Sequence, residues 1–144
     1  NYHKARVKLV KIHEKIANQR IDFLHKQSSK LIKENQIIVL EDLNVKGMMK
    51  NEKLTQRIGN CSWSEFIRLL EYKAEWYGRT VHKIGIFFPL SQLCSVCGYQ
   101  NAQVKALSIM EWVCPKCGSI HDRDTNASKN ILKQGLKELK IEVA

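Results

Sequence analysis

"CSVCGYQNAQVKALSIMEWVCPKCGSIHDRDTNASKNIL", residues 94–132, places two cysteine pairs directly before a cluster of acidic and amide residues. Cys94 and Cys97 enclose two residues, Cys114 and Cys117 do the same, and sixteen residues separate the pairs. This spacing is typical of a zinc ribbon. Four thiolates complete a tetrahedral zinc shell, so we expect a structural Zn²⁺ ion, ahead of a redox or iron–sulfur centre.

The residues around the cysteines favour the same structure. Gly98 and Gly118 follow the pairs and supply the permissive backbone that a metal-binding knuckle needs. His121 is an alternative ligand. Because four cysteines already fill the metal shell, we expect His121 instead to lie beside the metal site or to contact nucleic acid. Residues 109–113 are predicted to form a hairpin strand, in which Trp112 either packs the ribbon or offers a stacking surface.

A helix is predicted to follow the ribbon, starting near Asp124, which is a candidate N-cap. Its expected buried face carries apolar side chains, namely Ala127, Ile131, Leu132 and Leu136. Asn126 and Asn130 lie four residues apart and therefore share one face of the helix. From there they could hold backbone or carboxylate groups near the helix start.

Upstream of the ribbon, residues 4–34 predict a long amphipathic helix. Its apolar stripe comprises Val10, Ala17, Ile21, Leu24 and Leu31. Its other face carries basic side chains, namely Lys11, Lys15, Arg20 and Lys26. These would suit a phosphate backbone or plain exposure to solvent equally well.

The run that follows, residues 37–40, is apolar throughout and typical of a strand covered on both faces in a parallel or mixed sheet. Glu41 comes next, at the carboxyl end of this strand, where ligand sites collect in α/β sheets. A strand-end acid can also be simply solvated or salt-bridged. Residues 47–60 are polar without clear periodicity, so we expect a loop there.

A second helix and a second strand are predicted between this loop and the ribbon. Ser62 and Glu65 form a candidate capping box, and Gly78 offers a left-handed stop. The expected buried face of the helix comprises Phe66, Leu69, Leu70, Lys73 and Tyr77. Residues 81–89 read as a strand closed by Pro89. The order helix, strand, helix, strand indicates an α/β fold class.

Composition limits the partners of this chain of 144 residues. Lysine and arginine number 24 against 14 acidic residues, and the net charge of +10 favours a polyanion such as nucleic acid. No apolar run approaches the roughly 18 residues of a membrane span, so we expect a cytoplasmic protein with no membrane partner. In that compartment close cysteine pairs indicate metal binding rather than disulfide bonds. The fifth cysteine, Cys61, is expected to be a small packing residue. Because the chain starts at Asn1 rather than methionine, we expect a fragment.

Four motifs, in order and spacing, resemble the C-terminal half of transposon-encoded TnpB proteins, which are related to the type V CRISPR effector nucleases. They are "IIVLEDLNVKGM" (37–48), "FFPLSQLCSVCG" (87–98), "WVCPKCG" (112–118) and "HDRDTNASKNIL" (121–132). The resemblance implies a RuvC-type nuclease domain of the RNase H fold. It also implies that the zinc ribbon is inserted before the last catalytic motif.

The resemblance further implies two catalytic carboxylates. Glu41 resembles the second catalytic carboxylate of the family and Asp124 the third. Asp122 is the neighbouring candidate, but the family aspartate stands two residues before the asparagine of D-x-N-A, which favours Asp124. Such a site takes Mg²⁺ or another divalent cation. The first catalytic aspartate of the family lies on an earlier strand that the residues before Lys4 do not supply, so we expect this chain alone to be inactive.

Three segments are predicted: a partial RuvC-like α/β region lacking its first strands (1–93), the zinc ribbon (94–120), and a RuvC-like C-terminal segment and helix (121–144). The implied function is that of the C-terminal part of a transposon-associated, metal-dependent DNA endonuclease. Its expected partners are DNA and, in the full-length family, guide RNA. The alternatives are a non-catalytic zinc-ribbon module that binds nucleic acid and a zinc-ribbon adaptor that binds protein.

Overall fold

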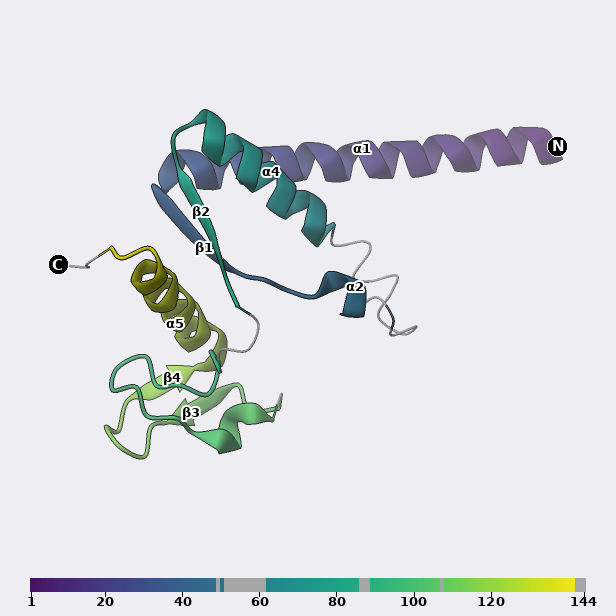
Figure 1. Cartoon of the computed structure of the whole chain (residues 1–144). Helices are drawn as coiled ribbons and strands as arrows, with labels where there is room; N and C mark the ends of the chain where they lie inside the picture. Colours follow the sequence, from purple (N-terminus) through teal and green to yellow (C-terminus); the bar gives the residue numbers. More distant parts are fainter. Residues whose placement is uncertain (49, 51–61, 86–88, 107, 142–144) are drawn as a thin grey trace. The chain divides into compact units, whose positions relative to one another are not determined.

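A computed structural model describes residues 1–48, 50, 62–85, 89–106 and 108–141. Its elements are α1 (Tyr2–Glu34), β1 (Ile37–Glu41), α2 (Val45–Met48), α4 (Trp63–Trp76), β2 (Thr80–Ile84), a 3-10 helix η1 (Ala102–Lys105), β3 (Glu111–Val113), β4 (Ile120–Asp122) and α5 (Arg123–Glu138) (Figure 1). Within these ranges, none of the helices combines the length and the apolar character that crossing a bilayer requires.

The chain forms two compact units. The first comprises Asn1–Ile37 and Val45–Thr80, and the second comprises Ile38–Asn44 and Val81–Ala144. Each unit therefore contains segments that are far apart in the sequence, and each is described by itself below.

The first unit is held together by packing between α1 and α4. Its buried apolar side chains include Leu24 and Ile32 of α1 and Leu69 and Leu70 of α4. The buried ammonium of Lys73 donates hydrogen bonds to the carbonyl oxygen of His25 (2.8 Å) and the hydroxyls of Ser28 (2.7 Å) and Ser29 (2.8 Å). All three of its protons thus have acceptors, which is what allows a charged group to remain in this interface.

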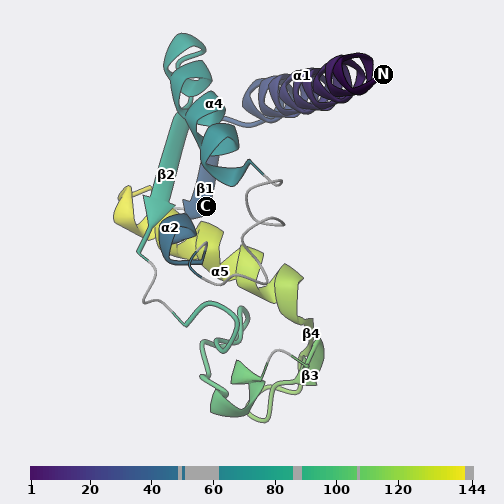
Figure 2. The same ribbon diagram turned by 90° about the vertical axis from the view of Figure 1, so that its right-hand side faces the viewer.

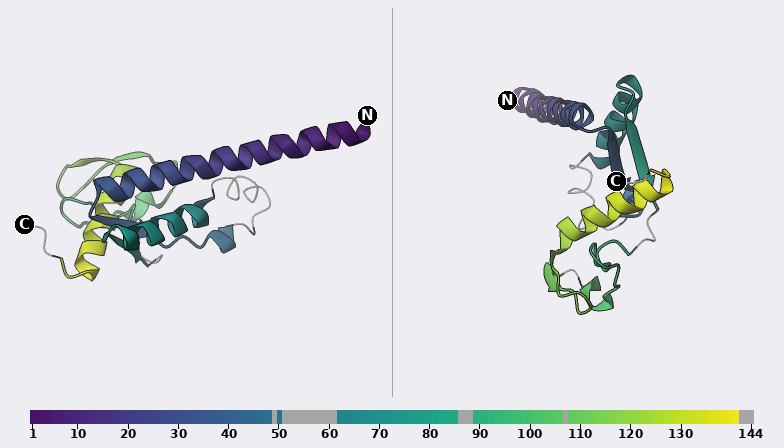
Figure 3. Two further views of the ribbon diagram at one scale, coloured as in Figure 1. Left: turned by 90° about the horizontal axis from the view of Figure 1, so that it is seen from above. Right: turned by 90° about the vertical axis from the view of Figure 1, so that its left-hand side faces the viewer.

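The long helix α1 is confirmed, but its predicted apolar stripe is largely wrong. Leu24 is buried, whereas Val10 and Ile21 are 59% and 49% exposed. The buried residues of α1 are Leu24, Ser28 and Ile32, all in its C-terminal half. Figure 3 shows the reason, since α4 runs beside that half of α1 only.

The start and stop of α4 are where the sequence predicts them, but the capping box does not form. Ser62 has φ 49° and ψ 37° and makes no side-chain capping bond. A capping side chain needs extended backbone, which this left-handed conformation does not give. Glu65 instead pairs with Arg68 at 2.6 Å. Gly78 ends the helix at φ +60°, as predicted.

Most of the predicted buried face of α4 is confirmed. Leu69, Leu70 and Lys73 are buried, Phe66 is half-buried, and Tyr77 is 51% exposed. Ile67 and Ala74 complete the buried set.

In the second unit, β1 and β2 pair side by side. The backbone N–H of Asp42 donates to the carbonyl of Ile84 (3.1 Å), beyond the end of β1 and at the end of β2. At the other end, Thr80 N–H donates to the carbonyl of Gln36 (3.0 Å), so the strands run parallel and α4 lies in the connection between them. Every residue of β1 is half-buried, which corrects the expectation of a strand covered on both faces. Among the described strands β2 is its single neighbour, so one edge of β1 is unpaired there.

Helix α5 packs against β1 at a glycine. A Cβ built on Gly135 would lie 2.6 Å from Cγ2 and 3.0 Å from Cβ of Val39, and closer still to Cγ1. Only a residue without a side chain allows this approach. His82 Nε2 of β2 and Glu138 Oε2 of α5 are also 2.6 Å apart, so α5 is attached to both strands of the pair.

Some predictions fall wholly or partly outside the described residues. Of the predicted loop 47–60, residues 47 and 48 belong to α2, residue 50 forms a turn, and the others lie outside the description. Cys61 and residues 86–88 of the predicted second strand lie outside it too.

Candidate functional site

Four cysteine thiols converge in the second unit. Their Sγ atoms all lie within 4.8 Å of one another, with Cys94 to Cys117 at 3.7 Å and Cys97 to Cys114 at 3.6 Å. A disulfide requires about 2.05 Å, and the thiols are free. Tetrahedral zinc with Zn–S bonds of about 2.3 Å places its sulfurs about 3.8 Å apart. The predicted cluster is confirmed, and its geometry is compatible with zinc.

Two equivalent knuckles bring the thiols together. In the first, Gly98 N–H donates to the carbonyl of Cys94 (2.9 Å), and in the second, Gly118 N–H donates to the carbonyl of Cys114 (2.8 Å). The glycines have φ values of +73° and +72°, the left-handed conformation that side chains disfavour. The predicted role of both glycines is therefore confirmed.

Strands β3 and β4 support the second knuckle. They pair antiparallel, with Trp112 opposite His121. Trp112 is 7% exposed and packs with Val104, Cys94 and Cys114, so it fills the ribbon core rather than offering a stacking surface. His121 is buried beside it, with ring centroids 4.7 Å apart, and its Nε2 lies 3.1 Å from Cys94 Sγ. The histidine thus lies next to the cluster, outside the four thiols.

The thiols differ in acidity. Hydrogen bonds from the hydroxyl and backbone N–H of Ser119 lower the pKa of Cys117 to about 6. At Cys97 the backbone N–H of Tyr99 lowers the pKa, but burial and the three neighbouring sulfurs outweigh it and raise it to about 12. Metal binding needs thiolates, and the site already favours one at Cys117.

Two buried amides attach the first knuckle to α5. Asn126 accepts the backbone N–H of Ser95 (2.9 Å) and donates to the carbonyl of Leu93 (2.6 Å). Asn130 donates to the carbonyls of Leu90 and Leu93, both at 2.8 Å. The amides thus hold backbone groups, one of the two predicted possibilities, and fix the knuckle to the first turns of α5. Figure 2 shows that α5 starts directly at the end of β4.

The buried face of α5 differs from the prediction. It consists of Asn126, Asn130 and Gly135, whereas Leu132 is 46% exposed. The predicted apolar residues Ala127, Ile131 and Leu136 are half-buried. The inward face is polar because it satisfies the backbone of the loop that enters the ribbon.

The N-cap of helix α5 lies two residues earlier than predicted. Asp122, the last residue of β4, is the N-cap and accepts the N–H of Thr125 at 2.8 Å. Hydrogen bonds from the hydroxyl and the backbone N–H of Thr125 lower the pKa of Asp122. Asp124 is therefore not the cap, and its exposed carboxylate lies in the first helical turn.

Glu41 ends β1 in the same unit, and its side chain is half-buried. Within that unit, β1 contacts α5 where Val39 meets Gly135, so the two candidate carboxylates belong to two elements that pack together. Among the described residues, the only group of three or more potential ligand side chains within 4.8 Å is the cysteine cluster, and neither Glu41 nor Asp124 belongs to such a group.

Sequence reasoning missed three contributors to this region. Gly135 was recognisable only as a glycine inside a helical pattern, which often marks close packing. Ser119, and the pairing of His82 with Glu138, left no signal because these contacts depend on the folded chain.

Two family models match the chain. Residues 63–131 match the model described as "Cas12f1-like, TNB domain", and residues 1–52 match the model described as "Probable transposase".

Relatives cover nearly all of this chain. A protein of Streptomyces pristinaespiralis named "Putative RNA-guided DNA endonuclease" is 46% identical over 136 residues, covering 94% of this chain and 33% of that protein. "TnpB-like protein L79" of Acanthamoeba polyphaga mimivirus is 31% identical over 136 residues, covering 90% of this chain and 25% of that protein. The chain thus spans a third or less of the length of these two relatives.

A solved structure shares the fold. A chain of the Cas12f1–sgRNA–target DNA complex, determined by cryo-EM, matches with a TM-score of 0.63 and 21% identity. The match covers 90% of this chain and 39% of that one, and it shows a common mixed α/β fold.

Proposed function

We propose that this chain, which belongs to the TnpB-type proteins, supplies two metal-binding carboxylates, Glu41 and Asp124, to a RuvC-type DNA endonuclease site of the RNase H fold. One observation carries the proposal: the strand that ends in Glu41 packs at Val39 against the helix whose first turn holds Asp124. An acid at the carboxyl end of a parallel strand is also where α/β sheets bind ligands.

The donor chemistry suits a hard divalent cation. Carboxylate oxygens are the preferred protein ligands of Mg²⁺, and Mg²⁺ bound here would activate water and stabilise the leaving oxygen of a phosphodiester. Glu41 would be held by the end of β1, where Asp42 N–H is hydrogen-bonded to Ile84. Asp124 would be held by the first turn of α5, which Asp122 caps.

The zinc ribbon has a positioning role in this proposal. Four thiolates leave zinc no open coordination position, so the ion would be structural. Because Asn126 and Asn130 bind the knuckle loop, the folded ribbon fixes the start of α5 and with it the backbone of Asp124. Loss of zinc should therefore impair cleavage without any direct part of zinc in the reaction.

The names of the relatives supply the substrate class of the proposal. We take the substrate to be DNA and the specificity to come from a guide RNA, as the name of the Streptomyces relative states for that protein. The net charge of +10 is suited to both polyanions.

The test is cleavage of a DNA target by the guide-loaded protein carrying Glu41→Gln or Asp124→Asn. Each variant keeps the shape of the side chain and removes its charge, and we expect each to lower the cleavage rate at least 100-fold while zinc content stays unchanged. Asp42→Asn is the matched control, since it makes the same kind of change at the exposed neighbour of Glu41. Cleavage at the wild-type rate by Asp124→Asn would refute the assignment.

A second candidate function is a non-catalytic zinc-ribbon module that binds nucleic acid. The closed set of four thiols and the basic charge favour it. It predicts nucleic-acid binding that weakens steeply with salt and does not change when Mg²⁺ is added. Mg²⁺-dependent cleavage that requires Glu41 would exclude it.

A further inference from the structure

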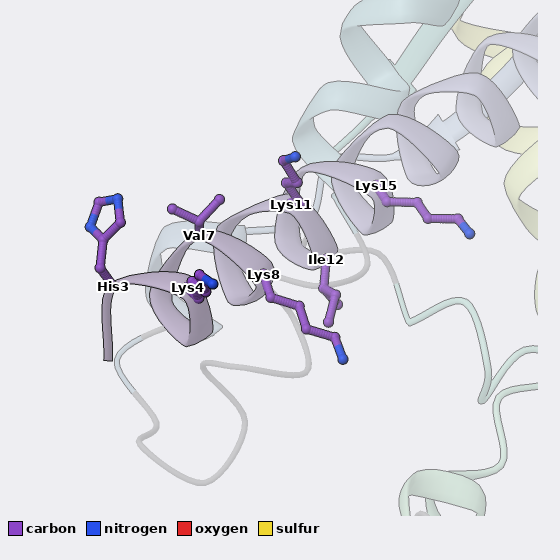
Figure 4. A pocket seen from close by; sticks show the side chains of 7 residues that line it. All are labelled: His3, Lys4, Val7, Lys8, Lys11, Ile12 and Lys15. Atoms are coloured by element: carbon purple, nitrogen blue, oxygen red, sulfur yellow. The ribbon is translucent and has the colours of Figure 1, made fainter. Parts of the chain in front are cut away.

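Four lysines form a row along the N-terminal half of α1: Lys4, Lys8, Lys11 and Lys15, called here the lysine ladder. Figure 4 shows them leaving successive turns of the helix, together with His3, Val7 and Ile12. At 3.6 residues per turn, spacings of four, three and four residues keep the lysines within an arc of about 60°. At 1.5 Å per residue, the ladder is about 16 Å long.

No other residue of the helix from Tyr2 to Ile21 falls within this arc. The next position on the same line is Asp22, whose carboxylate is already paired with Lys26 at 2.7 Å. The ladder is therefore a purely cationic stripe that ends at a neutralised pair.

The positive charges of the ladder are not paired with acidic side chains within the described protein. All four side chains are exposed, and none forms an ion pair or hydrogen bond with any residue that the structure describes. Neighbouring lysines three and four residues apart repel one another and destabilise the helix.

A second lysine row on α5, made by Lys129, Lys133 and Lys137, illustrates the difference. Lys137 of that row lies in the last turn of its helix, where the dipole favours a cation. No lysine of the ladder lies in the last turn of α1, where the dipole would favour it, and no described element covers the ladder. Its charge therefore fits a polyanion outside the described chain better than a role in helix stability.

We propose that the lysine ladder binds the phosphate backbone of duplex DNA. One strand of B-DNA carries a phosphate every 3.4 Å along the duplex axis, so a row of about 16 Å can follow several consecutive phosphates. Lysine suits this task because it acts as a point charge on a flexible stem. The inference rests on the proposed function only in its choice of DNA as the polyanion, and the contact is independent of sequence.

The test is the salt dependence of binding to a 20-base-pair DNA duplex, measured by fluorescence anisotropy on zinc-loaded protein without added Mg²⁺. Lys8→Gln/Lys11→Gln should lower the slope of log K against log salt by about 1.8, since each phosphate contact contributes about 0.9. Between 50 and 200 mM salt, the wild type should lose about tenfold more affinity than this variant.

The matched control is Lys30→Gln/Lys33→Gln, which removes the same charge from the C-terminal end of the same helix, beyond the Asp22–Lys26 pair where the ladder ends. Its slope should change by less than half as much. Because glutamine and lysine have similar helix propensities, α1 should remain folded in both variants, as circular dichroism can verify. Lys8→Arg/Lys11→Arg should keep the wild-type slope, because it preserves the charge.

Equal slopes for the ladder and control variants would overturn the proposal, because net charge rather than the ladder would then drive binding. A wild-type slope in the ladder variant would also overturn the proposal, because the ladder would then not contact DNA. Failure of the proposed nuclease function would give a different result from failure of the ladder proposal. In that case cleavage would survive Asp124→Asn, while the salt slope would still depend on the ladder.

Discussion

Replacing Gly135 by alanine tests how closely α5 must approach β1. The added Cβ would lie 2.6 Å from Cγ2 of Val39 and nearer to Cγ1, whereas carbon atoms pack at about 3.5 to 4.0 Å. Val39 is β-branched and stiff at χ1, so the backbones have to separate by about 1 Å or more. Such overpacking costs about 1–3 kcal/mol and outweighs the roughly 1 kcal/mol by which alanine is favoured over glycine in a helix.

A double-mutant cycle isolates this contact. In the Val39→Ala background both Cγ atoms are gone and only the Cβ at position 39 remains close, at 3.0 Å, so Gly135→Ala should be much less destabilising there than in the wild type. We expect a coupling energy of about 1–3 kcal/mol between the two sites, measured by urea unfolding of the zinc-loaded protein. Gly85→Ala is the control, because nothing lies within 4 Å of a Cβ built at Gly85.

The cycle also connects packing to activity. If α5 carries Asp124 to the site, Gly135→Ala should slow DNA cleavage by the guide-loaded protein, and Val39→Ala should partly restore it. A coupling energy within about 0.3 kcal/mol of zero, or stabilisation of the wild type by Gly135→Ala, would refute the close packing argued here.

Three further outcomes are expected. Cys114→Ser should release zinc and unfold the ribbon, because structural zinc contributes roughly 10 kcal/mol or more to such folds. Native mass spectrometry measures the zinc content, and retention of one zinc per chain would contradict the four-thiol site. Asn130→Leu should lower the free energy of unfolding by about 2 kcal/mol, because it leaves the carbonyl of Leu90 without this donor and removes one of the two donors to the carbonyl of Leu93, and a wild-type value would argue against that role. Hydrogen bonds from the hydroxyl and the backbone N–H of Thr125 lower the pKa of Asp122, so their stabilising effect should be complete above the ordinary value of 3.8 and vanish as pH falls through the lowered pKa. The difference in Tm between wild type and Asp122→Asn should therefore shrink in acid, and a difference independent of pH would contradict it.

The metal cluster and the element order were accessible from sequence because their signals are local. Two residues between cysteines and a following glycine define a knuckle without reference to the rest of the chain, and the structure brings the four thiols of Cys94, Cys97, Cys114 and Cys117 together. The apolar run before Glu41 similarly identified β1. Hydrophobic periodicity sufficed for the long helix α1.

The buried faces were less accessible because they depend on neighbours far away in the sequence. Ile21 has the right spacing for a core position, yet α4 does not reach it and it stays exposed. Asn126 and Asn130 look like surface residues until the loop before the ribbon supplies backbone groups for them. The capping box at Ser62 failed for a local reason, since its left-handed backbone is not visible in residue types.

The most direct test of the nuclease assignment is affinity cleavage of the polypeptide by Fe²⁺ substituted for Mg²⁺. With ascorbate and peroxide, iron bound between the carboxylates generates hydroxyl radicals that cut nearby backbone. We expect cuts next to Glu41 and next to Asp124 in the zinc-loaded, guide- and DNA-bound protein. Excess Mg²⁺ should suppress these cuts, and the Glu41→Gln/Asp124→Asn variant should lack them. Cuts confined to other segments, or cuts that persist in that variant, would contradict the assignment.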